Sequence, residues 1–186
     1  AENDRYPWND IGNGRLFADV FKAIARFVPE RKQWHIYDGT RWVSDTGSLK
    51  TMELCKALAD ALMRYALDIH DEHKRKSYID FCRKWQSRHM RITILSDAQS
   101  VYPISMQEFD SDRFLFNCAN GTLDLRTMEF RDHSAEDRLT KITPVEYDPH
   151  AWSDRYSRFI SEIMSGNAEK AKFLQKALGY SVSGDT

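Results

Sequence analysis

The sequence predicts an α+β fold that is predominantly α-helical and contains two or more β-hairpins. The dipeptides Asp38-Gly39 and Asn120-Gly121 each lie between β-rich runs, and such dipeptides favour hairpin turns because they tolerate positive φ. Longer segments repeat their apolar residues at steps of three and four, which is the spacing of an amphipathic helix. The second pattern covers more of the chain, so helices are expected to predominate.

The first helix is predicted from Leu16 to Val28, with helical apolar spacing throughout. Asp10 or Asn13 is expected to cap its amino end, and Pro29 to end it.

A second, longer helix is predicted to open at Ser48. Its apolar stripe fits a core better than a neighbouring subunit, although the spacing allows both. The stripe consists of Met52, Cys55, Ala59, Leu62, Ala66 and Ile69.

The first hairpin is predicted over residues 34–43, with a two-residue turn at Asp38-Gly39. Its aromatic residues could form a platform for bases, but a cross-strand pair that stabilises the hairpin is the preferred interpretation. These residues are Trp34, Tyr37 and Trp42. The second hairpin is predicted within residues 114–130, with a further turn at Arg126-Thr127.

We place a domain boundary near Pro149, which divides the chain into residues 1–149 and 150–186. Ser134 to Asp137 has the spacing of a helix cap before this boundary. Beyond it an amphipathic helix is predicted, followed by a C′ glycine at Gly166 and a second helix capped by Asn167. The apolar positions of the first of these helices are Tyr156, Phe159, Ile160, Ile163 and Met164.

Composition and motifs argue against several functions. The formal net charge of −1 gives no overall attraction to nucleic acid, so any binding must come from a local patch. The sequence has no phosphate-binding loop of the form G-x-x-x-x-G-K-[ST] and no membrane-length apolar run. The three cysteines lack metal-ligand spacing and are expected to be reduced, buried thiols of a cytoplasmic protein.

Three small groups of polar residues resemble sites without completing one. Carboxylates cluster at residues 68–72 and at Asp110 and Asp112, and His70 lies three residues before His73. Solvated charges and a surface histidine pair explain these groups better than metal ligands, because zinc needs at least three protein ligands. We therefore expect no catalytic or metal-binding residue.

The best binding candidate is residues 70–91, where seven basic side chains face only three acidic ones, a local charge of +4. Basic side chains bind phosphates, and Trp85 among them could stack on an unpaired base. The alternative is an ordinary helix whose Phe81 and Trp85 lie in the core. The candidate DNA-binding residues are Lys74, Arg75, Lys76, Arg83, Lys84, Arg88 and Arg91.

The order of the motifs resembles a known family. Four motifs follow one another in the order found in the domain that directly precedes the superfamily 3 helicase of phage and plasmid primase–helicases. They are Phe114-Leu-Phe-Asn117, Asn120 to Leu125, Leu139 to Ile142 and Leu178-Gly-Tyr180. The chain is also similar to the matching part of poxvirus helicase–primases. Its amino end resembles the family's opening at residues 10–16 and its early hairpin at residues 34–42.

The resemblance implies that the chain is an accessory part of a longer, ATP-dependent replicative helicase, with residues 150–186 as the first helices of the helicase domain. ATP and Mg²⁺ would bind elsewhere in that protein, and none is expected here. The implied partners are single-stranded or forked DNA, the protein's own helicase domain and further copies in a ring, in the cytoplasm of the host cell.

Three hypotheses remain open from the sequence. The chain could be a collar or linker that acts through subunit contacts. It could be a stand-alone module of a replication initiator that binds single-stranded or forked DNA. It could be an enzyme, such as a nuclease, that uses Asp71 or Asp110.

Overall fold

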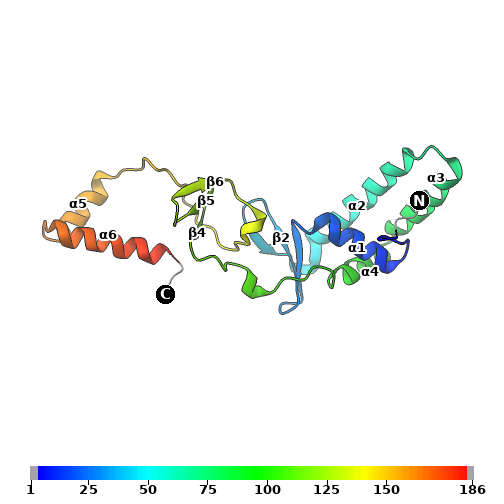
Figure 1. The fold of residues 1–186 in the computed structure, drawn as a ribbon, viewed down its shortest axis with the longest axis horizontal. Helices are drawn as coiled ribbons and strands as arrows, with labels where there is room; N and C mark the ends of the chain where they lie inside the picture. The colour runs from blue at the N-terminus through cyan, green and yellow to red at the C-terminus, as the bar shows by residue number, and fades with distance from the viewer. Residues whose placement is uncertain (1–3, 184–186) are drawn as a thin grey trace. The chain divides into compact units, whose positions relative to one another are not determined.

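A computed structural model of the chain describes residues 4–183, which contain six α-helices and two three-stranded antiparallel sheets (Figure 1). The predicted α+β class is confirmed. The described residues form two compact units, which are treated separately below. The first comprises residues 4–38 and 42–109, and the second comprises residues 39–41 and 110–183.

The first unit packs four helices with one small sheet, whose strand order is β1-β2-β3. Its core is aromatic and aliphatic, with Phe17, Cys55, Trp85 and Ile94 fully buried. The elements are α1 (Asp10–Phe21), β1 (Ala25–Val28), β2 (Gln33–Tyr37), β3 (Trp42–Ser44), η1 (Thr46–Ser48), α2 (Leu49–Leu67), α3 (Glu72–Trp85), α4 (Arg88–Ala98) and η2 (Met106–Glu108).

The amino end of α1 differs from the prediction in its cap. Asn9 is the N-cap, and its side-chain oxygen accepts a 2.9 Å hydrogen bond from the backbone N–H of Gly12. Asp10 lies in the first turn instead, and Asn13 is buried inside the helix. The cap is one residue earlier than expected because Asn9 keeps an extended backbone conformation, as a capping residue requires.

The first helix also ends at Phe21 instead of Val28, because residues 25–28 form strand β1. This strand pairs antiparallel with β2, with Phe27 opposite Trp34 and Val28 opposite Gln33. Over so few residues, apolar spacing alone cannot distinguish the end of a helix from a short strand. The strand is selected by its pairing partner and by the β-branched and aromatic side chains at its end.

The predicted hairpin of β2 and β3 is confirmed, but its turn is longer than expected. Tyr37 pairs with Trp42, which leaves a four-residue loop over residues 38–41. Gly39 has φ +102°, whereas Asp38 is not among the residues with positive φ, so the two-residue turn that requires both is absent. The Tyr37 and Trp42 rings lie 6.0 Å apart across the strands, as the preferred interpretation of these aromatics predicted.

Helix α2 begins after Ser48 as predicted, yet Ser48 makes no side-chain cap bond. The buried carboxylate of Asp45 takes that role, accepting from the backbone N–H of Lys50 at 3.0 Å and of Thr51 at 2.8 Å. The predicted stripe faces the core, with Cys55, Ala59 and Ala66 buried. Helix α1 packs closely along α4 at Gly14.

The second unit holds a sheet with strand order β4-β5-β6 and a pair of helices. Its hairpins occur where predicted, although the first turn is at residues 119–120 and Gly121 begins β5. The capping sequence at Ser134 forms a single 3-10 turn instead of a helix. The elements are β4 (Leu115–Cys118), β5 (Gly121–Asp124), β6 (Glu129–Arg131), η3 (Ala135–Asp137), α5 (Asp154–Ile163) and α6 (Ala168–Val182).

Asn117 organises the loops beside this second sheet. Its side-chain amide donates to the carbonyl oxygens of Thr40 at 3.0 Å and Lys141 at 2.9 Å, and its oxygen lies 2.9 Å from Nδ1 of His133. Asn167 caps α6 as predicted, accepting from the N–H of Lys170. The C-cap of α5 is Met164, so Ser165 occupies the C′ position predicted for Gly166, which follows it with φ +71°. The proposed boundary near Pro149 stays a prediction.

Candidate nucleic-acid interface

The basic segment singled out in the sequence, residues 70–91, spans two helices. Helix α3 ends at Trp85, residues 86–87 form a break, and α4 begins at Arg88. The seven basic side chains therefore do not share one surface, and each has to be considered from its own position.

Arg91 acts within the fold. Its Nη1 donates to the carbonyl oxygen of Trp85 at 3.0 Å and to that of Gln86 at 2.6 Å. These carbonyls end α3, where the helix leaves acceptors without intrahelical donors. Arg91 thus caps α3 from α4, and its guanidinium is committed to that structural contact.

Helical geometry places the other basic residues of α3 on different faces. Lys74 is four residues before Tyr78 and seven before Phe81, so it lies on the same side of α3 as these two rings, and its side chain is exposed. Lys76 and Arg83 point about the opposite way, and Arg83 forms an exposed ion pair of 3.1 Å with Asp80. Such exposed pairs contribute little to stability, so they leave the outer face solvated.

The remaining basic residues lie between these extremes. Arg75 is half-buried, whereas Lys84 and Arg88 are exposed on either side of the break between α3 and α4. Lys84 and Arg88 are therefore both accessible to solvent, outside the residues that line the cleft described below.

Trp85 has no exposed surface. It packs edge-on against Phe81, with the ring centroids 6.5 Å apart, and belongs to the core of the first unit. Its predicted role as a base-stacking residue is therefore wrong, because no face of the indole is accessible. The helical spacing it shares with Phe81 reflects core packing, which was the alternative interpretation.

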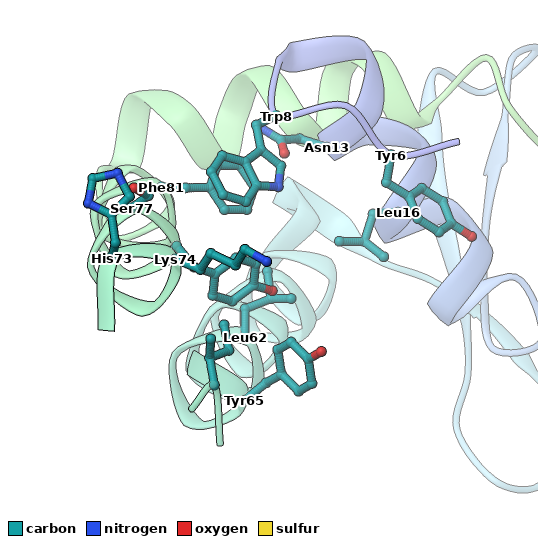
Figure 2. Close-up of a pocket in the computed structure, with 12 residues that line it drawn as sticks. Tyr6, Trp8, Asn13, Leu16, Leu62, Tyr65, His73, Lys74, Ser77 and Phe81 are labelled. Carbon is teal, nitrogen blue, oxygen red and sulfur yellow. The ribbon is translucent and has the colours of Figure 1, made fainter. Parts of the chain in front are cut away.

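The aromatic surface that is accessible lies in a cleft of about 790 Å³ in the first unit (Figure 2). This volume is within the range of about 300–1,000 Å³ that is common for ligand sites. The cleft is formed by the segment before α1, by α1 itself, by the end of α2 and by the start of α3. Its lining consists of Tyr6, Trp8, Asn13, Leu16, Leu62, Tyr65, Ile69, His73, Lys74, Ser77, Tyr78 and Phe81.

The aromatic rings of the cleft form a connected wall. Trp8 stacks on Phe81 with a centroid distance of 4.9 Å and an interplanar angle of 11°. Tyr78 meets Trp8 and Tyr65 edge-on, each at 5.6 Å. Trp8 is 44% exposed and Tyr65 is 59% exposed, so both offer apolar ring surface to a ligand.

The polar side chains of the cleft favour an anionic ligand. Lys74 extends into the cleft, and His73 and Ser77 stand at its edge (Figure 2). Among the described residues that line the cleft there is no Asp or Glu. Burial raises the pKa of Tyr78 to about 12, so this residue adds no negative charge to the cleft.

Sequence reasoning missed most of this wall. Tyr6 and Trp8 precede the first predicted helix, and Tyr65 is not part of the predicted apolar stripe of the second helix. An isolated Trp immediately before the cap of a helix was the available signal, since an indole so placed usually packs against a neighbouring element. The sequence does not identify the elements against which this indole packs.

The carboxylates considered for metal binding are engaged in local structure. Asp71 caps α3 by accepting from the backbone N–H of Lys74, which is the main cause of its lowered pKa. Asp110 accepts from the backbone N–H of Thr140 at 2.8 Å, and Asp112 pairs with Arg126. Within residues 4–183, no three His, Cys, Asp or Glu side chains gather as a metal site.

None of the helices in residues 4–183 is long and apolar enough to span a bilayer. A family model described as "D5 N terminal like" matches residues 14–165, which is most of the chain. No match was found among curated proteins.

Proposed function

Because the chain belongs to the D5 N terminal like family, the domain that precedes the superfamily 3 helicase in primase–helicases, we propose that it serves DNA replication as a non-catalytic accessory domain. In a phage- or plasmid-type protein it would link the primase to the helicase, support assembly of the helicase ring and help to engage DNA. ATP and Mg²⁺ would bind to the helicase domain of the full-length protein in the host cytoplasm.

The observation that carries the linking role is the apolar surface of α5 and α6. Both helices are amphipathic. Among their described residues, however, Ile160 is the only hydrophobic residue that is buried. Exposed apolar area of this kind marks an interaction surface. The exposed large residues are Tyr156, Phe159, Ile163, Phe173, Leu178, Tyr180 and Val182.

The role of this apolar surface in ring assembly is tested in the full-length primase–helicase by Phe159→Asp combined with Ile163→Asp. The expected result is loss of the ring in mass photometry, because charges on the apolar face oppose its burial. Arg158→Asp changes the charge of the same helix and is the matched control. Rings that form equally well with the apolar face disrupted would contradict the proposal.

A second candidate is a stand-alone module that binds single-stranded or forked DNA. It is favoured by the cleft with its aromatic wall and Lys74, and by the exposed cations Lys84 and Arg88. Fluorescence anisotropy with both DNA types at two salt concentrations tests this candidate. Binding that weakens with salt and falls in the double variant Lys84→Glu, Arg88→Glu is the expected result. Absence of binding at low salt would leave assembly as the domain's role.

A further inference from the structure

We propose that the cleft of the first unit binds an unpaired base of single-stranded DNA against the exposed ring surface of Trp8 or Tyr65, with Lys74 on the neighbouring phosphate. The inference rests on the proposed engagement of DNA and identifies where an exposed base would lie. It replaces the predicted stacking residue, Trp85, by two aromatic residues that the solvent can reach.

The aromatic wall supports a planar ligand. Trp8 is held by its parallel contact with Phe81, and Tyr65 by its edge contact with Tyr78. These contacts fix the rings before a ligand arrives, so little side-chain freedom remains to be lost on binding. Aromatic rings accept every base on their faces, which suits a replication protein that must tolerate any sequence.

The charge of the cleft supports an anionic chain beside that base. Lys74 reaches into the cleft, and the nearest capping carboxylate, that of Asp71, accepts its hydrogen bond from the backbone N–H of Lys74. His73 and Ser77 add further donors at the edge. An apolar peptide would satisfy the rings but would make no use of these polar groups.

The occupant is expected to be single-stranded for a geometric reason. In a duplex the bases are stacked on one another, and their faces cannot reach a concave aromatic wall without being flipped out. An unpaired strand presents its bases freely. The cleft therefore distinguishes single strands from duplexes through stacking, whereas Lys84 and Arg88 can contact the phosphates of either form.

The test compares two labelled strands of equal length by fluorescence anisotropy: oligothymidylate and an abasic strand with the same phosphates. The complete chain should bind oligothymidylate roughly 5- to 150-fold more tightly than the abasic strand. Trp8→Ala and Tyr65→Ala should each reduce this ratio. Lys74→Gln should weaken binding of both strands. It should also reduce the slope of the logarithm of the binding constant against the logarithm of the salt concentration by about one, as the loss of one phosphate contact would.

Matched controls come from the same chain. Trp152→Ala removes an indole that is 79% exposed outside the cleft, and Lys76→Gln removes a cation from the opposite face of α3. Neither should change the ratio of the two affinities. Circular dichroism and urea unfolding identify any variant that fails to fold, and the highly exposed Tyr65 provides a substitution with little effect on the core.

Three results would overturn the inference. Equal affinity for both strands would show that phosphates alone are bound, which leaves the proposed engagement of DNA intact. If thymidine monophosphate displaced the labelled strand at a concentration equal to that of the strand, the cleft would be a site for free nucleotides. Absence of binding to either strand at low salt would contradict the proposed engagement of DNA as well.

Discussion

The hydroxyl group of Tyr102 donates a 2.6 Å hydrogen bond to the carboxylate of Asp19, which lies 83 residues earlier in the chain. Tyr6 and Arg5 donate to the same carboxylate, at 2.8 Å and 2.7 Å. This arrangement ties the segment before α1 and the segment after α4 to one side chain of α1. Burial alone would raise the pKa of Asp19, but the hydrogen bonds from Tyr102, Arg5 and Tyr6 outweigh it and lower the pKa to about 2.

The lowered pKa makes this contribution to stability depend on pH. Since the carboxyl of an unfolded chain titrates near 3.9, the contribution is complete above that value and is lost as the pH falls towards about 2. Urea unfolding of the native chain and of Asp19→Asn should differ most at neutral pH, and the difference should shrink in acid. A difference that does not change between neutral pH and pH 2 would show that the pKa is not lowered.

Gly14→Ala should destabilise the first unit by roughly 1–3 kcal/mol, as overpacking of a core usually does. A Cβ atom at residue 14 would lie 2.7 Å from Cβ of Asp97 and 3.1 Å from the backbone nitrogen of Ala98. Urea unfolding measures the loss. The matched control is Gly179→Ala in α6, where an added Cβ meets nothing, so the better helix propensity of alanine should leave stability equal or higher.

Trp85→Ala should cost about 3–5 kcal/mol in unfolding free energy, because it leaves a large cavity in the core. Trp85→Phe should cost less, since the indole N–H that it removes is buried without a hydrogen-bond partner. Folded Trp85→Phe should bind DNA as the native chain does. A loss of DNA affinity without a loss of stability would restore Trp85 as a binding residue.

The buried thiols should react slowly with alkylating reagents. Burial raises the pKa of Cys55 to about 12 and that of Cys82 to about 11, and it also raises the pKa of Cys118. Relative to an ordinary thiol of pKa 9.0, Cys55 would have about 10³-fold less reactive thiolate at pH 8. Mass spectrometry after iodoacetamide treatment should show little labelling in buffer and complete labelling in urea. Rapid labelling of the folded chain would refute this expectation.

The predicted elements were most accurate where one local signal dominated. Helix α2 and the hairpin of β2 and β3 were identified from periodicity and from the turn dipeptide. Strand β1 was missed because Phe27 and Val28 fit a helical stripe and a strand equally well. Its state depends on pairing with residues 33–36, which is a tertiary contact that local spacing does not contain.

The candidate site was predicted less well, for a related reason. Counting charges over residues 70–91 ignored the rotation of the helix, which places Lys74 beside the cleft and Lys76 on the opposite side of α3. It also ignored the break after α3, which commits Arg91 to capping. Trp8 and Tyr65 could not be brought together from the sequence, because their proximity depends on how α1, α2 and α3 pack.

The walls of the cleft come from three separate stretches of chain, at residues 6–16, 62–69 and 73–81. A synthetic peptide copied from residues 70–91 would carry all seven cations of the basic segment and neither Trp8 nor Tyr65. Such a peptide would report electrostatic attraction to phosphates and nothing of the recognition of a base. Minimal mimics or inhibitors of this surface therefore have to reproduce the junction of three helices instead of a linear epitope.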